Sequence, residues 1–173
     1  MAIKQGALTD NDWVVTTRSG AKLAPVTATA FQPFLVRFGM PETAAFCDVA
    51  WGAFEDTGTL LGVGVLTACG PHQARAWIGV LPERRRFGIA GDLLAVLVRE
   101  ANERQLRHLT CIHNASDVAP VRLVRSVGLV PSRRVYGGIA TMIVPIPIKS
   151  PAASLHDRGA RGQHDDSRLP GPG

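Results

Sequence analysis

Residues 80–91 read VLPERRRFGIAG, and this stretch decides how the chain is interpreted. It follows a short β-prone run at 74–80 (ARAWIGV) and leads directly into a segment with helical periodicity. The start of a helix presents backbone N–H groups without intrahelical partners, together with the positive end of the helix dipole. Gly88 and Ala90 would let an anion approach these groups, and the three arginines at 84–86 add positive charge. We therefore predict an anion-binding loop here.

The segments that follow the loop predict a helix and then a second strand. Apolar residues recur at the three- and four-residue intervals of one helical face, at Ala90, Leu93, Leu94, Leu97, Val98 and Ala101. The run at 109–113 (LTCIH) is β-prone, so it should lie parallel to the strand at 74–80. A second helix is expected at 118–127, with Asp117 as its cap and Pro120 in its first turn.

The remaining elements are expected to complete the sheet and to cover it. The turn residues EDTG at 55–58 separate two apolar runs, which predicts a β-hairpin. Pro33 lies inside a segment that otherwise predicts a helix, and Gly137-Gly138 inside the last strand predicts a β-bulge. By position, we expect strands at 13–18, 45–54, 59–67 and 133–144 and a helix at 28–38.

Length and composition predict one folded domain with loose ends. The chain has 173 residues, the usual length of one domain. Hydrophobic residues make up 46% and charged residues 19%, a balance that supports a buried core. We expect a loose N-terminus at 1–12, a folded domain at 13–148, and a disordered tail at 149–173 that is rich in Pro, Gly, Ser and charges.

The positive charge of the chain favours an anionic partner. The formal charge is +5 and the pI is about 9.7, which suits a nucleotide cofactor, a nucleic acid or an acidic surface. A nucleic acid ranks last, because no aromatic stacking platform accompanies the arginines at 133–134. The sequence lacks the layout of a signal peptide and lacks an apolar run of about 18 residues. We expect a soluble cytoplasmic protein, monomeric or homodimeric, that does not bind membranes.

The cysteines and histidines predict neither disulfides nor a metal site. Cys47, Cys69 and Cys111 are odd in number and lack the paired spacing of a zinc site or a redox dithiol. His72 and His108 have no ligand partners at metal-site spacing. Reduced thiols and no metal are therefore expected.

Arg85, Gly88 and Ala90 fit the pattern Gln/Arg-x-x-Gly-x-Gly/Ala, and here the chain resembles the GNAT superfamily of N-acetyltransferases, which hold a pyrophosphate at this loop. The resemblance extends over about residues 59–144. It implies the acyl-CoA N-acyltransferase fold, an α/β fold in which helices flank a mixed central sheet and two parallel strands splay apart to form a wedge for CoA. Acetyl-CoA or another acyl-CoA would be the co-substrate.

The resemblance also implies which residues contact the co-substrate. The main chain of Ile78, Gly79 and Val80 would pair with the pantetheine arm. Asp117 stands where many relatives open the second helix with an asparagine, and it would cap that helix or touch the cofactor, although its charge repels phosphate. The pyrophosphate would be wrapped by Arg85, Arg86, Phe87, Gly88, Ile89 and Ala90.

Two positions depart from the family pattern. Many relatives carry a glutamate on the strand before the loop as the base that deprotonates the amine, and Arg75 stands at that position. An arginine does not act as a base at neutral pH, but it could bind an acidic acceptor. The tyrosine that often protonates the departing thiolate is replaced by Val124.

Other residues are candidates for the missing base or acid. His113 ends the strand that would line the wedge, where a histidine can exchange protons near neutral pH, and Tyr136 could donate a proton from the last strand. Asp48 and Glu55 lie on the hairpin. Each has an ordinary structural explanation as well: surface hydrogen bonding for the histidine, packing for the tyrosine and solvation for the carboxylates. Cys111 is expected to be a buried small hydrophobe rather than a nucleophile.

Two functions are compatible with these features. The first is an acyltransferase that moves an acetyl or other short acyl group from acyl-CoA to an amine of a small molecule or a protein lysine, mainly by positioning and by main-chain N–H groups. The second is a module that binds acyl-CoA and has weakened catalysis, as Arg75 and Val124 suggest. Binding with and without thiol release distinguishes them.

Overall fold

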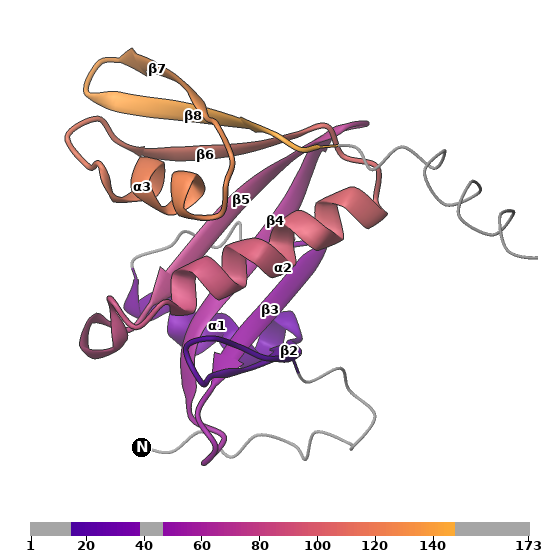
Figure 1. The fold of residues 1–173 in the computed structure, drawn as a ribbon, viewed down its shortest axis with the longest axis vertical. Helices are drawn as coiled ribbons and strands as arrows, with labels where there is room; N and C mark the ends of the chain where they lie inside the picture. Colours follow the sequence, from indigo (N-terminus) through magenta and orange to yellow (C-terminus); the bar gives the residue numbers. More distant parts are fainter. Residues whose placement is uncertain (1–14, 39–46, 148–173) are drawn as a thin grey trace, which may run out of the picture.

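A sheet with helices on both faces makes up the part of the chain that the computed structural model describes, residues 15–38 and 47–147 (Figure 1). The predicted loose N-terminus and the predicted tail lie outside these residues. The elements in chain order are β1 (Val15–Thr16), β2 (Lys22–Pro25), α1 (Ala28–Arg37), β3 (Val49–Phe54), β4 (Leu60–Gly70), β5 (Gln73–Val80), a 3₁₀ turn (Pro82–Arg84), α2 (Ile89–Glu103), β6 (His108–Asn114), α3 (Ala119–Ser126), β7 (Ser132–Tyr136) and β8 (Ile139–Pro145).

The strands form one mixed sheet in the order β1-β2-β3-β4-β5-β6-β8-β7. Neighbouring strands are antiparallel except β5 and β6, which are parallel and are joined by the crossover through α2. A parallel pair requires such a long connection, and the helix periodicity between the two runs predicted it. The expected α/β fold with a mixed central sheet and flanking helices is therefore confirmed.

Helix α2 packs closely against the middle of the sheet, across β3, β4 and β5 (Figure 1). Two glycines of β4 make this approach possible: a Cβ on Gly62 would lie 3.2 Å from Leu93, and one on Gly64 would lie 3.1 Å from Leu97. Leu93 and Leu97 are completely buried, which stabilises the fold by about 1.5–3 kcal/mol for each side chain. This packing fixes the direction of α2 and so the position of its N-terminus.

Helix α1 covers the opposite face of the sheet. Phe31, Phe34 and Leu35 are buried there against residues of β3 and β4. Pro33 is exposed on the other side of the helix, so the buried face continues past it. The helix predicted at 28–38 is confirmed, because the packing of its apolar residues offsets the one backbone hydrogen bond that proline removes.

Helix α3 follows the sequence prediction closely. Pro120 lies in its first turn, and the backbone N–H of Ala119 donates to the carboxylate of Asp117 at 2.9 Å. Gly128 follows its end with a φ of +81°, a conformation that glycine adopts without steric cost. The N-cap is Val118, one residue later than predicted, and Asp117 before it accepts a hydrogen bond from the first turn.

The predicted final strand with a bulge is wrong, because residues 133–144 form a hairpin of two strands. Gly137 and Gly138 have φ values of +55° and +80° and make a two-residue turn between Tyr136 and Ile139, which pair with each other. Positive φ at both central residues is the geometry of the tightest β-hairpins, and a Gly-Gly pair supplies it. A bulge needs at most one residue with positive φ. Two consecutive glycines therefore indicated a turn rather than a bulge.

Candidate active site

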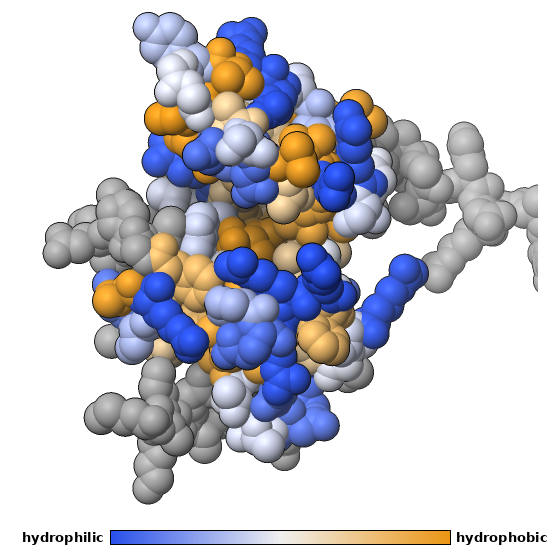
Figure 2. All heavy atoms as spheres, turned by 90° about the vertical axis from the view of Figure 1, so that its left-hand side faces the viewer, coloured by the Kyte–Doolittle hydropathy of each residue, from blue (hydrophilic) through white to orange (hydrophobic). Residues whose placement is uncertain are grey.

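Strands β5 and β6 separate soon after they begin to pair, which opens a wedge in the sheet. Their parallel ladder runs from Gln73–His108 to Arg75–Thr110 and ends there. A cavity of about 970 Å³ lies between the diverging strands and extends between α2 and α3. Figure 2 shows it as a hollow with apolar residues on its floor and hydrophilic residues along its rim. The splayed parallel strands that the family resemblance implied are present.

The loop before α2 forms the mouth of this cavity. Gly88 is the N-cap of α2 with a φ of +89°, and no side chain caps the helix. The N–H groups of Gly91 and Asp92 both donate to the Gly88 carbonyl, so the free donors are those that precede them. Gly88, Ile89, Ala90 and Gly91 line the cavity, and Ile89 is also buried and anchors the first turn. The helix start therefore has free amides at the mouth of the cavity, a geometry that suits an anion, and anion binding itself stays a prediction.

The positive charge at the loop is smaller than the three arginines suggested. Arg84 forms an ion pair with Glu55 of the β3–β4 turn, so this carboxylate neutralises it. Arg85 and Arg86 also line the cavity and form no ion pair with the described residues. The side chain of Phe87 is 61% exposed and does not line the cavity. Of the predicted loop contacts, the structure places all but Phe87 at the mouth.

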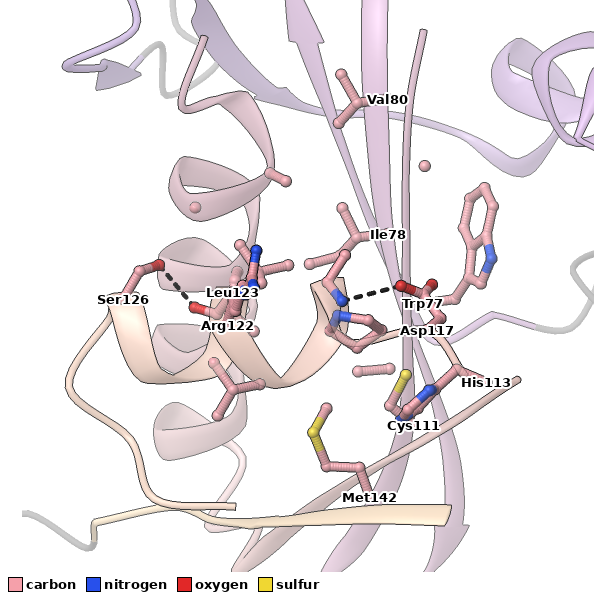
Figure 3. A pocket seen from close by; sticks show the side chains of 18 of the residues that line it. Trp77, Ile78, Val80, Cys111, His113, Asp117, Arg122, Leu123, Ser126 and Met142 are labelled. Carbon is pink, nitrogen blue, oxygen red and sulfur yellow. Dashed lines mark hydrogen bonds between the residues drawn. The ribbon is translucent and has the colours of Figure 1, made fainter. Parts of the chain in front are cut away.

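The β5 side of the wedge offers unpaired main chain. Ile78, Gly79 and Val80 pair with β4 on one side and, within the described residues, meet no strand on the other. An extended molecule with amide groups can pair with such an inner edge as an added strand would. Figure 3 shows the side chains of Ile78 and Trp77 leaving β5 on opposite sides. Trp77, Ile78, Gly79 and Val80 all line the cavity, so the wedge opens to both faces of the sheet.

Trp77 was missed as a site residue, and Gly79 determines where its indole lies. A Cβ on Gly79 would lie 2.3 Å from the ring of Trp77, so the indole occupies the position that a side chain at residue 79 would take. The ring also meets Phe38 edge to face, with centroids 6.0 Å apart. The spacing Trp-x-Gly on one face of a strand was the available signal.

The β6 side of the wedge carries His113 and Cys111, which point to the same face of the strand (Figure 3). The Nδ1 atom of His113 lies 2.8 Å from the carbonyl of Asn114. A carbonyl only accepts, so Nδ1 carries the proton, and in the neutral ring Nε2 is then the acceptor. Nε2 is buried and has no hydrogen-bond partner in the protein. The structure therefore places an unpaired proton acceptor inside the wedge.

Cys111 is held as a thiol. Burial raises its pKa, and the negative charge of Asp117 raises the pKa further. A thiol is a weak nucleophile compared with the thiolate. The expectation that Cys111 is not a nucleophile agrees with this environment.

Helix α3 contributes the remaining wall of the cavity. Val124 is only 3% exposed and belongs to the core, so its position supplies no acid. Arg122 lines the cavity beside Leu123 and forms no ion pair within the described part of the chain. Sequence reasoning missed Arg122, because nothing in the pattern separates it from Arg125 on the same helix.

The other candidates for acid or base lie away from the cavity. Tyr136 is 92% exposed beside the β7–β8 turn, and Glu55 is paired with Arg84. Asp48 accepts the backbone N–H of Ala68. None of the three lines the cavity, so the structure brings only His113 of the four to the wedge.

The described residues contain neither a cluster of metal-ligating side chains nor a membrane-spanning helix. In that part of the chain, His, Cys, Asp and Glu side chains form no group of three that could hold a metal ion. No helix among residues 15–38 and 47–147 is long and apolar enough to cross a membrane. The cysteines at 47, 69 and 111 are free thiols.

The fold and the wedge agree with comparisons to known proteins. The sequence pattern of the Acetyltransferase (GNAT) family matches residues 24–128, more than half of the chain, and the chain belongs to this family. A comparison with curated protein sequences gives no match.

Several solved structures share the fold at low sequence identity. The GNAT domain of S. lividans PAT has a TM-score of 0.63 and 16% identity, covering 78% of this chain and 96% of its own. The phosphinothricin acetyltransferase of Sinorhizobium meliloti, solved in complex with AcCoA, has a TM-score of 0.60 and 16% identity over 73% and 88%. The ribosomal-protein-S18-alanine N-acetyltransferase of Escherichia coli has a TM-score of 0.56 and 16% identity over 76% and 97%. At this identity the likeness is one of fold.

Proposed function

We propose that this protein is an N-acyltransferase that moves an acetyl or other short acyl group from acyl-CoA to an amine, with His113 as the base. The observation that carries the proposal is the wedge itself. Its mouth presents the free amides of the α2 start, and its interior holds the unpaired Nε2 of His113. A protein of the same family and fold, the S. meliloti phosphinothricin acetyltransferase, was solved with AcCoA bound.

The chain's residues divide the work of holding the co-substrate. The amides at Gly88 and Ala90, with the guanidinium groups of Arg85 and Arg86, suit the pyrophosphate. Arg122 lines the same cavity and would supply a third cation, since it forms no ion pair within the described residues. The inner edge of β5 would pair with the pantetheine amides. These contacts would orient the thioester between the strands, which converts a bimolecular reaction into a positioned one.

In the proposed transfer, the amine nitrogen attacks the thioester carbonyl carbon, so that a C–N bond forms and the C–S bond breaks. Nε2 of His113 accepts the proton that the amine loses, which the Nδ1 contact to Asn114 allows. The CoA thiolate leaves and takes up a proton. Since Cys111 remains a thiol, direct transfer is favoured over an acyl-cysteine route.

The test combines binding and turnover on the full chain. We expect acetyl-CoA to raise Tm and to release free thiol in the presence of an accepted amine. His113→Gln should retain the Tm shift and lower kcat by about 100- to 10,000-fold, the range for removal of a general base. His72→Gln, on the exposed β4–β5 turn, is the matched control and should change neither. An unchanged kcat in His113→Gln would reject His113 as the base.

A module with weakened catalysis remains the second candidate. Two observations favour it: Arg75 replaces the usual base, and Val124, where the usual acid would stand, is buried in the core. This function predicts a Tm shift with acetyl-CoA and no thiol release with any amine. Without a Tm shift, both candidates fail.

A further inference from the structure

Arg75 lies at the vertex of the wedge, on the face of the sheet opposite α2. It pairs with Thr110 as the last step of the parallel ladder, immediately before β5 and β6 separate. Its neighbours Ala74 and Ala76 pack into the core beneath α2, so the side chain of Arg75 points to the other face. Trp77, on that same other face, packs toward α1. Arg75 does not itself line the cavity; it adjoins Ala76, where the cavity lining begins on β5, and lies at the opposite end of this strand from the phosphate loop.

This inference rests on the proposed function, in which one face of the wedge receives the co-substrate and the other receives the acceptor. The loop at Gly88 and the cation of Arg122 lie on the side of α2 and α3, so the co-substrate enters from there. Its chain would then run from the loop along Val80 toward Ile78, which brings the thioester end closest to Arg75. The wedge opens to both faces of the sheet, so the acceptor would enter from the face of Arg75 and extend its amine between the strands toward the thioester and His113.

The surface available to the amine is apolar and aromatic, with basic residues at its edges. The indole of Trp77 is half-buried and lines the cavity. Ile112 also lines it and is 52% exposed on the same face, because it follows Thr110 by two residues on β6. Arg134 shares that face, since Thr141 of β8 is the direct partner of both Arg134 and Ile112.

No carboxylate neutralises Arg75 within the described residues. It forms no ion pair there, and its side chain is exposed. Continuing the β3–β4 register one residue beyond Val49–Leu66 sets the carboxylate-bearing Asp48 opposite Thr67, the β4 partner of Arg75. That is two strand spacings from Arg75, about 10 Å, and the carboxylate already accepts the N–H of Ala68. The guanidinium is therefore free for a ligand.

A free guanidinium beside an apolar floor selects for an oxyanion. Arginine presents a planar fork of N–H donors that matches a carboxylate, and its charge disfavours a cationic group nearby. Ile78 lies three residues from Arg75, about 10 Å along the strand and on the other face, so the long arginine side chain has to lean along β5 toward the wedge to meet a small acceptor. Only a few bonds would then separate the anion of the acceptor from the amine that reacts.

We infer that the acceptor is a small aminocarboxylate with an apolar or aromatic side chain, and that Arg75 determines this specificity by binding its carboxylate. The position that departs from the family pattern thus acquires a role in acceptor choice. A lysine side chain in a basic peptide is the opposite kind of acceptor, since it brings positive charge to this face.

The experiment compares acceptors that differ only in the anion. Thiol release from acetyl-CoA is measured on the full chain with L-phenylalanine and L-phenylalaninamide, L-methionine and L-methioninamide, phenethylamine and a basic lysine peptide. The proteins are the wild type, Arg75→Gln, Arg75→Lys and the control Arg125→Gln, which removes an exposed arginine of α3 outside the cavity. Each acceptor is compared between variants, which cancels its intrinsic nucleophilicity.

We expect the wild type to use the aminocarboxylates. Arg75→Gln should lower kcat/KM for them by about 10- to 100-fold, mostly through KM, as expected for the loss of a charge-assisted hydrogen bond. The amides should change less than about two-fold in the same variant. Arg75→Lys should recover part of the loss, because it restores the charge without the fork. Arg125→Gln should behave as the wild type for every acceptor.

Three results would overturn the inference. The first is turnover limited to acceptors without an anion. The second is an equal loss for aminocarboxylates and amides in Arg75→Gln together with a lower Tm, which would show that Arg75 only supports the sheet next to Thr67. The third is the absence of thiol release with every amine despite a Tm shift by acetyl-CoA, which removes the transferase function and this inference with it. In the first two cases the transferase function stands.

Discussion

Replacement of Gly88 by asparagine and by aspartate separates the backbone requirement of the phosphate loop from its charge requirement. The two side chains have nearly the same shape, and both tolerate the left-handed conformation better than other residues do. At φ +89° a Cβ would lie 3.7 Å from Ser19, an ordinary contact, so both residues meet the same backbone strain and no close contact at Cβ. The difference between the two variants therefore reports the charge alone.

The expected magnitudes follow from the geometry. Left-handed backbone costs a non-glycine residue up to about 1–2 kcal/mol, so both variants should melt several degrees below the wild type without ligand. The aspartate should lose slightly less, because a negative charge at a helix start gains about 0.3–1 kcal/mol. With CoA bound, the order of the two melting temperatures reverses, and the asparagine variant becomes the more stable one. A carboxylate about 5 Å from one phosphate charge costs about 3 kcal/mol at an effective dielectric constant of about 20, which weakens binding by about 100-fold or more.

Thermal melting with and without CoA measures both effects. At a CoA concentration of about 100 times the wild-type Kd, the wild type should gain about 2.7 kcal/mol. Gly88→Asp should gain at most about 0.4 kcal/mol at the same concentration, and Gly88→Asn should keep most of the gain. Equal CoA-induced shifts in the two variants would refute the reasoning, since no anion could then lie against the amides of this loop.

Three further predictions concern the cavity wall and the hairpin. Iodoacetamide should modify exposed Cys69 faster than Cys111 at neutral pH, because burial and Asp117 raise the pKa of the Cys111 thiol. The modification rate of Cys111 should rise with pH. Mass spectrometry should show that CoA protects Cys111 and not Cys69. Gly79→Ala should lower the free energy of unfolding by about 1–3 kcal/mol in urea, because the new methyl meets the Trp77 ring, and Trp77→Leu in the same chain should relieve much of that loss. Gly138→Ala should lose about 1–2 kcal/mol and Gly138→Asn less, since φ is +80° there; equal losses would contradict a left-handed turn residue.

Much of the fold was accessible from the sequence because it rests on local patterns. The spacing of the apolar residues in α2 and the turn between β3 and β4 act over a few residues, and both predictions are confirmed. The strand predicted at 59–67 extends to Gly70, because a two-residue turn at 71–72 continues the hairpin through a segment that reads as a breaker. The strand β2 was missed, since four residues ending in Pro25 carry too little pattern to mark a strand.

The site was only partly predictable because its details depend on contacts between distant residues. The loop at Gly88 follows from local sequence, and the structure confirms its position at the start of α2. The pairing of Arg84 with Glu55 joins residues 29 positions apart, and no local pattern signals it. In the same way, the opening of the wedge beside His113 depends on the end of the pairing between β5 and β6, which are joined through α2.

The short ladder between β5 and β6 has a mechanical consequence for the molecule. Within the described residues the sheet ladder between the β1–β5 portion and the β6-β8-β7 portion has only three residue pairs, whereas the buried core under α2 spans both portions. Few backbone hydrogen bonds cross this junction, so the free energy of local opening should be lower there than elsewhere in the sheet. A ligand that hydrogen-bonds to the inner edges of both β5 and β6 would rigidify the junction, and the two portions would then fluctuate and unfold together.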